Sequence, residues 1–178
     1  AAPILERYGL RGSFAVIADA IGTSGAYMTW DQCRDLRDRG HEINVHGPIG
    51  GNGSLLNYAT AAEAAADVSF HRNLVIANGC NVNGSANCYV WPQGNNAFAN
   101  GDTSIVDAVT ALGIKCARGV DNTREDSLLP WGSRMLMYQS IVGHAWASEG
   151  TEVANIAAIQ QRVVDNVAAK RPSVFMLH

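Results

Sequence analysis

The chain has 178 residues, with 13 basic and 16 acidic side chains and a formal net charge of -3. This balance provides no basic stripe for nucleic acid and no polybasic face for a membrane surface. No stretch approaches the ~20 consecutive apolar residues of a membrane span, and no charged start followed by an apolar core indicates a signal peptide. We therefore expect residues 1–178 to form a single domain that neither binds nucleic acid nor inserts into a membrane.

Helical and extended patterns alternate along the chain. The capping pairs Thr29/Gln32 and Thr60/Glu63 each open a helix, and Asp102 or Thr103 caps another. The patterns predict helices over residues 3–8, 30–39, 60–78, 103–112 and 151–170, and strands over residues 12–18, 41–46, 88–91, 114–118, 135–142 and 173–177. Because the apolar runs lack polar alternation, they are typical of strands covered on both sides, which favours a parallel sheet or barrel.

The four cysteines show no zinc-ribbon or CxxC spacing. Cys33 lies on a predicted helix and Cys116 in a predicted strand, where a small buried apolar side chain is the ordinary interpretation. Cys80 and Cys88 bracket the polar loop 81–87 and would close a small ring in an oxidising compartment. The alternative is that these two cysteines are reduced core residues as well.

Three of the five histidines occupy the last position of a short apolar run: His46, His144 and His178. In folds where strands alternate with helices, side chains at the carboxyl ends of strands converge on one rim, where such folds keep their chemistry. We therefore expect these three imidazoles to share one pocket. The glycine-rich loop after His46 would let backbone approach a ligand or metal closely.

The other two histidines have ordinary interpretations. His41 precedes His46 by five positions, so strand alternation places it on the opposite face, and we expect it to hydrogen-bond within the scaffold. His71 lies in the middle of a predicted helix beside Arg72 and is predicted to be a solvated side chain.

Five collinear segments resemble the polysaccharide deacetylase family, also called the NodB-homology or carbohydrate esterase 4 domain. The most specific is Gly-His-Glu-Ile-Asn-Val-His, which ends at His46. The matching segments are residues 5–14, 28–46, 89–94 (Tyr-Val-Trp-Pro-Gln-Gly), 113–118 and 174–178 (Val-Phe-Met-Leu-His). Because they follow the family's order, the resemblance covers nearly the whole chain.

The resemblance implies an α/β fold, a distorted (β/α) barrel of the polysaccharide deacetylase type with about six to seven strands. It further implies that the family's first strand, which carries paired aspartates acting as base and metal ligand, is missing upstream of Ala1, and that the chain is also cut at its C-terminus. The implied activity is hydrolysis of an acetyl group on an acetylated amino-sugar polysaccharide. The implied cofactor is a divalent metal, with zinc as the expected ion.

The resemblance also implies roles for individual residues. His46 stands at the family's first histidine ligand, and His178 at the general acid that protonates the leaving amine, a task that suits imidazole. The backbone N–H of Gln93 stands at a position that stabilises the oxyanion. The remaining substrate-binding residues implied by the motifs and strand ends are Trp91 with an apolar face for a sugar ring, Pro92 and Arg118, with Asp121 as an acidic partner that orients His178.

Two positions depart from the family pattern. The second histidine ligand is replaced by Gly50, and the arginine that steadies the base is replaced by Val90. His144 would supply the lost ligand from its own strand end, or alternatively contacts sugar or hydrogen-bonds His178. Arg118 would bind substrate or a carboxylate, or alternatively forms a surface ion pair.

These residues leave three functional hypotheses. The first is a metal-dependent polysaccharide deacetylase, located outside the cell, on the cell surface or on a virion. The second is a catalytically degenerate carbohydrate-binding or structural domain of a larger envelope or virion assembly. The third is a glycoside hydrolase, which requires two carboxylates facing each other, and Glu42, Asp19 and Asp121 form no clear pair in the sequence.

Overall fold

The computed structural model describes residues 2–47, 57–92, 102–120 and 138–142, together with residues 161, 164, 165, 168, 175 and 176. Its elements are α1 (Ala2–Arg7), β1 (Ser13–Ile17), α2 (Trp30–Asp38), β2 (Glu42–His46), α3 (Ala61–Ala77), the 3-10 turn η3 (Ser85–Asn87), β3 (Cys88–Val90), α4 (Ser104–Ala111), β4 (Cys116–Val120), β5 (Tyr138–Val142) and β6 (Phe175–Met176). Every predicted strand overlaps an observed one, usually with tighter ends, and the strand predicted over residues 114–118 is shifted two residues later, to Cys116–Val120.

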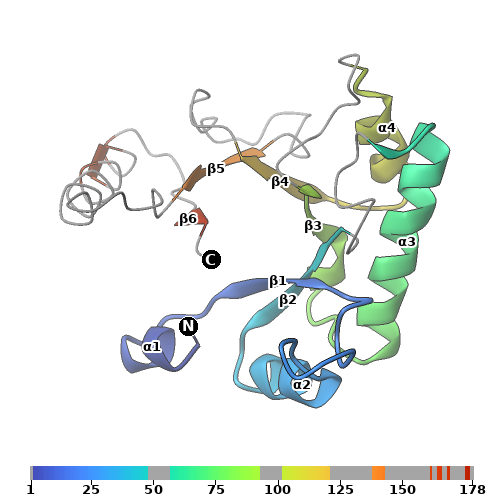
Figure 1. The fold of residues 1–178 in the computed structure, drawn as a ribbon. Helices are drawn as coiled ribbons and strands as arrows, with labels where there is room; N and C mark the ends of the chain where they lie inside the picture. Colours follow the sequence, from blue (N-terminus) through green and yellow to red (C-terminus); the bar gives the residue numbers. More distant parts are fainter. Residues whose placement is uncertain are drawn as a thin grey trace.

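The strands form a parallel sheet in the order β1-β2-β3-β4-β5-β6. Strand order therefore equals chain order, and each connection crosses over to return in the same direction. Figure 1 shows α2, α3 and α4 on the outer side of the bent sheet. The predicted α/β class with a parallel sheet is confirmed.

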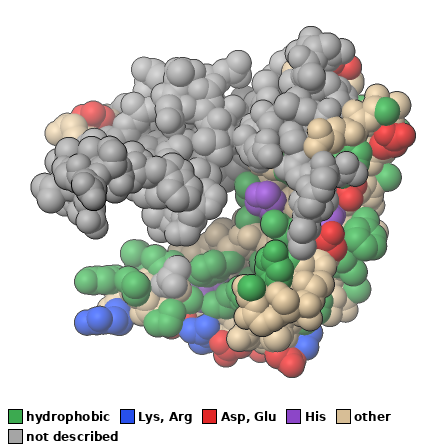
Figure 2. All heavy atoms as spheres, viewed as in Figure 1, with side chains coloured by type: hydrophobic (Ala, Val, Ile, Leu, Met, Phe, Trp, Pro, Cys, Tyr) green, Lys and Arg blue, Asp and Glu red, His purple; other side chains and the backbone are tan. Residues whose placement is uncertain are grey.

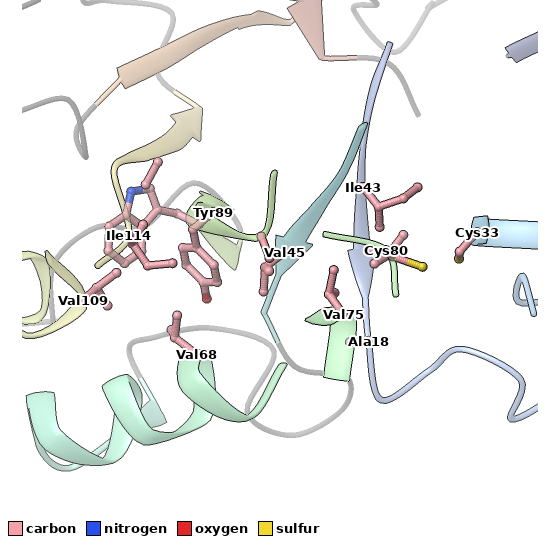
Figure 3. Close-up of a cluster of buried hydrophobic side chains, with 14 of the residues drawn as sticks. Ala18, Cys33, Ile43, Val45, Val68, Val75, Cys80, Tyr89, Val109 and Ile114 are labelled. Atoms are coloured by element: carbon pink, nitrogen blue, oxygen red, sulfur yellow. The ribbon is translucent and has the colours of Figure 1, made fainter. Parts of the chain in front are cut away.

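Alternation along the strands separates two faces of the sheet. Register pairs Val45 with Tyr89 and His46 with Val90, so the members of each pair point to the same side. The side facing the helices carries the buried residues Val16, Ile43, Val45, Tyr89 and Ala117. Figure 3 shows Tyr89 and Val45 directed toward Val68 of α3 within this core. Asn44, His46 and Val90 therefore lie on the face turned away from these helices.

Helix starts follow the predicted caps, with one change at α3. Thr29 and Gln32 form the complete capping box of α2. At α3, Thr60 accepts from the backbone of Glu63, but the Glu63 carboxylate accepts from the Ala59 N–H. At α4, the Asp102 carboxylate accepts from the backbone N–H of Ser104 at 2.8 Å.

The observed disulfide joins Cys88 to Cys116, whose Cα atoms are 4.8 Å apart. These residues are the first positions of β3 and β4 and are register partners. The predicted Cys80–Cys88 ring is therefore wrong, as is the interpretation of Cys116 as an unpaired core residue. Sheet pairing brought Cys88 next to a cysteine 28 positions away in sequence, while Cys80 is buried with a free thiol.

Figure 2 shows hydrophobic side chains exposed around α1, at the lower left of the molecule. The exposed apolar residues in this region are Ile4, Tyr8 and Leu10. Among the described residues, no helix combines the length and apolar character needed to cross a bilayer.

A buried histidine connects α1 to the start of β2. The Gly12 N–H donates to Nδ1 of His41 at 3.0 Å, so the ring proton is on Nε2, which donates to Oε1 of Glu6 at 2.9 Å. Arg39 donates to both Glu6 oxygens. The expected scaffold role of His41 is confirmed.

These contacts predict a pH-dependent contribution of Glu6 to stability. The hydrogen bond from His41, followed by the charge of Arg39, holds the pKa of Glu6 below its ordinary value of 4.5 against the opposing effect of burial. A lowered folded-state pKa stabilises the fold above the unfolded-state pKa, and this contribution disappears as the pH falls through the folded-state value. Glu6→Gln is expected to be less stable than the parent at neutral pH, and the two proteins should converge in acid. Urea unfolding at several pH values measures this, and a stability difference that grows in acid would contradict it.

Candidate functional site

His46 is the last residue of β2, between Ile17 of β1 and Val90 of β3 in the register. It lies on the face of the sheet opposite the helix-covered core and is half-buried. Its Nδ1 is 3.4 Å from the backbone oxygen of Gly47. A ring proton donated to that carbonyl leaves the lone pair on Nε2, which is the form of imidazole that binds metal ions.

The residue after His46 is held in tight packing. A Cβ atom added to Gly47 would collide with Cγ of Pro92 and would lie 2.8 Å from the hydroxyl of Tyr89. Only a glycine fits this approach between the end of β2 and the segment after β3. The packing thereby fixes the backbone that carries His46.

Trp91 and Pro92 are both buried. The Trp91 ring packs edge-on against Tyr89, with ring centroids 5.1 Å apart. The sequence predicts an apolar face for a sugar ring at Trp91, whereas in the structure this side chain is 1% exposed and belongs to the core. Pro92 acts on the strand end through its packing against Gly47.

The side chains of several predicted site residues lie outside the described part of the structure. Arg118 lies in β4 opposite Val90 and Tyr138, and only its backbone is described. The remaining site residues of the sequence analysis lie outside the described residues: Gln93, Asp121, His144 and His178. The shared pocket of His46 with the other two strand-end histidines stays a prediction.

A second polar cluster, which we call the His71 cluster, lies between α3 and the strand ends. His71 is 1% exposed, so the prediction of a solvated side chain is wrong. Its Nε2 is 3.6 Å from Oδ2 of Asp67 one turn earlier, and its Nδ1 is 3.8 Å from Oδ1 of Asp19, two residues beyond β1. The imidazole therefore lies between two carboxylates that come from different elements.

Two tyrosines complete the His71 cluster. Burial raises the pKa of Tyr58, and the charge of Asp67 and a hydrogen bond to it add to this effect, as does the charge of Asp19. Burial also raises the pKa of Tyr89, with further contributions from Asp67 and Tyr58. Both hydroxyls are thus protonated around neutral pH. The Tyr89 hydroxyl and Nδ1 of His71 are buried without a hydrogen-bond partner.

The spacing of Asp67 and His71 is the signal that sequence reasoning missed. The two residues are four apart and lie on one face of α3, next to the buried positions Val68 and Val75. A histidine on the apolar side of a helix, one turn from a carboxylate, indicates a buried polar pair. The cluster reaches solvent through Asp19 and Asp67, whose side chains are 34% and 24% exposed.

Neither the surroundings of His46 nor the His71 cluster forms a complete metal centre within the described residues. In that part of the chain, no group of three or more His, Cys, Asp or Glu side chains is arranged to hold a metal ion. Among the described residues, the carboxylates considered for a glycoside hydrolase have other close contacts. Asp19 and Asp67 are separated by the His71 ring, and Glu42 accepts a hydrogen bond from Ser13.

Comparison with protein-family models, curated proteins and solved structures finds no match for this chain. The inference of function therefore depends on the residues and the fold alone.

The tight packing at Gly47 predicts a strong effect of one added methyl group. Gly47→Ala is expected to lower the free energy of unfolding by about 1–3 kcal/mol, because Pro92 and Tyr89 must move. Gly25→Ala is the matched control, since a Cβ there meets nothing within 4 Å. Equal unfolding midpoints for the two variants in urea would contradict the proposed packing.

Because the Tyr89 hydroxyl has no hydrogen-bond partner, we predict that removing it does not lower the free energy of unfolding. Tyr89→Phe is expected to be as stable as the parent or more stable, because a buried hydroxyl without a partner costs desolvation energy. Tyr89→Ala should cost roughly 3–5 kcal/mol through the cavity left by the ring. Denaturant unfolding compares the two, and a large loss in Tyr89→Phe would show that the hydroxyl has a stabilising partner.

Proposed function

We propose that the chain is a metal-dependent hydrolase that removes acetyl groups from an amino-sugar polysaccharide, on a distorted (β/α) barrel of the polysaccharide deacetylase type. The observation that carries the proposal is the position of His46, at the carboxyl end of a central parallel strand and on the face turned away from the helices. Support also comes from parallel strands in chain order and from the five collinear segments of the sequence.

The donor chemistry of His46 fits a zinc-type ion, because imidazole nitrogen is a preferred zinc ligand and the Gly47 carbonyl orients the ring. The ion, when bound, would polarise the acetyl carbonyl and activate water as the nucleophile. In this proposal His144 contributes a second imidazole. The Gln93 N–H stabilises the oxyanion, and His178 donates the proton that the leaving amine needs.

The Cys88–Cys116 disulfide supports a location outside the cell, on its surface or on a virion. Disulfides form and persist in oxidising compartments and are rare in reducing ones. Acetylated polysaccharides are found outside cells as well, so the proposed substrate and the covalent chemistry agree. The proposed partner is the polysaccharide itself, within a larger surface assembly and without nucleic acid.

A second candidate is a non-catalytic carbohydrate-binding or structural domain of a larger envelope or virion protein. The observation that favours it is the register of Val90, which lies beside His46 on the same face where the family pattern has an arginine. An aliphatic side chain there cannot steady a catalytic base. With Gly50 in place of a histidine, the domain would retain the fold without the reaction.

The two candidates are separated by metal analysis of the full-length protein together with acetate release from an N-acetylglucosamine oligomer. The enzyme hypothesis predicts bound metal and acetate release, and His46→Ala should weaken metal binding by at least about tenfold. His41→Gln is the matched control, since His41 belongs to the α1 contact and should leave metal binding unchanged. Oligomer binding without metal or acetate release would support the second candidate. A protein that neither binds nor hydrolyses the oligomer would contradict the enzyme hypothesis and the carbohydrate-binding form of the second candidate.

A further inference from the structure

The two free cysteines lie side by side in the core. Cys33 is on α2 and Cys80 follows the C-terminal end of α3, and both are completely buried with free thiols. Figure 3 shows their side chains pointing toward one another. The charge of a Cys80 thiolate raises the pKa of Cys33, which is a direct consequence of this proximity. A bond between the sulfurs would add a covalent link between α2 and the turn after α3.

Hydrogen bonds hold the Cys80 segment against α2. Arg34 donates to the backbone oxygen of Asn78 at 3.3 Å, and Arg37 donates to the backbone oxygen of Gly79. The Cys80 thiol donates to the Asn78 oxygen at 3.6 Å. Two arginines of α2 thus hold the turn that carries Cys80. These contacts, which do not involve sulfur, keep the Cys80 thiol next to the Cys33 thiol.

The surroundings of the two thiols give them different reactivity. Burial raises the pKa of Cys33 to about 11, the nearby Cys80 adds to this effect, and the charge of Arg34 opposes it. Burial raises the pKa of Cys80 as well; the charges of Arg37 and Arg34 oppose this effect, and the charge of Asp38 adds to it. Both Arg34 and Arg37 contact the turn that carries Cys80, whereas Arg34 alone acts on Cys33. Because the thiolate is the nucleophile, we expect Cys80 to react first when the core opens.

We propose that Cys33 and Cys80 are a latent dithiol that a low-molecular-weight disulfide oxidises to a second disulfide, joining α2 to the turn after α3. The Cys80 thiol loses its proton, attacks the reagent disulfide and releases one reagent thiol, which leaves a mixed disulfide on Cys80. The Cys33 thiolate then attacks the Cys80 sulfur, forms the Cys33–Cys80 bond and releases the second reagent thiol. Both protein thiols are oxidised and the reagent disulfide is reduced to two thiols. This site is independent of the function proposed above.

The test exposes the folded full chain to 2-hydroxyethyl disulfide at mildly alkaline pH and in denaturant below the unfolding transition, where local opening admits the reagent. Peptide mapping should find a Cys33–Cys80 crosslink beside an intact Cys88–Cys116 bond, with a mass loss of two hydrogen atoms. The oxidised protein should melt several degrees higher, because the new bond restricts the unfolded chain.

Two variants identify the order of reaction. Cys33→Ser should accumulate the mixed disulfide on Cys80, because no second thiol resolves it. Cys80→Ser should react several-fold more slowly, at Cys33. Circular dichroism checks that each variant is folded. A parent protein that carries two separate reagent adducts, that stays reduced until it unfolds globally, or that forms the crosslink only by exchange with Cys88 or Cys116 would overturn the proposal.

Discussion

The structure depends on the burial of one face of a parallel sheet under α2, α3 and α4. Tyr89 and Val45 are register partners on that face, and both pack toward Val68 of α3. Since successive residues of a strand point to opposite faces, this burial also decides what the other face presents. His46 faces away from the helices because its neighbour Val45 faces them.

Much of the fold follows from local patterns in the sequence. The capping box at Thr29, the glycines that end helices and the apolar runs all predict elements that the structure contains, because each depends on residues within one or two turns. The scaffold role of His41 was predictable for a similar reason, since strand alternation alone separates it from His46. Fold class could therefore be derived without any knowledge of distant contacts.

The errors share a different physical origin. Cys88 pairs with Cys116 because β3 and β4 align their first residues. The register between two strands cannot be predicted from the residue spacing within either strand. His71 is buried because its side of α3 faces the sheet, although its neighbour Arg72 suggested a polar helix face. Trp91 is a core residue whose ring packs edge-on against the buried Tyr89. Each case depends on tertiary packing that a sequence window does not contain.

The candidate site and the His71 cluster are coupled through one short segment of backbone. Gly47 directly follows His46, and the backbone of Gly47 packs closely against the Tyr89 side chain, whose hydroxyl is buried near the Asp67 charge. Tyr89 therefore approaches the segment after His46 and also lies within the electrostatic influence of Asp67 on α3.

The fold tolerates the buried Tyr89 hydroxyl without a partner because the ring that carries it contributes more than the hydroxyl costs. The desolvation cost of such a group is about 1–3 kcal/mol, whereas a buried aromatic ring contributes more than that by removing its apolar surface from water. The Tyr89 ring packs between Trp91 and the helix face, so the net effect favours keeping it. The backbone that carries His46 is thus held by the packing of Tyr89 and Pro92 against Gly47. The position of the imidazole at this strand end therefore depends on core packing on the opposite face of the sheet.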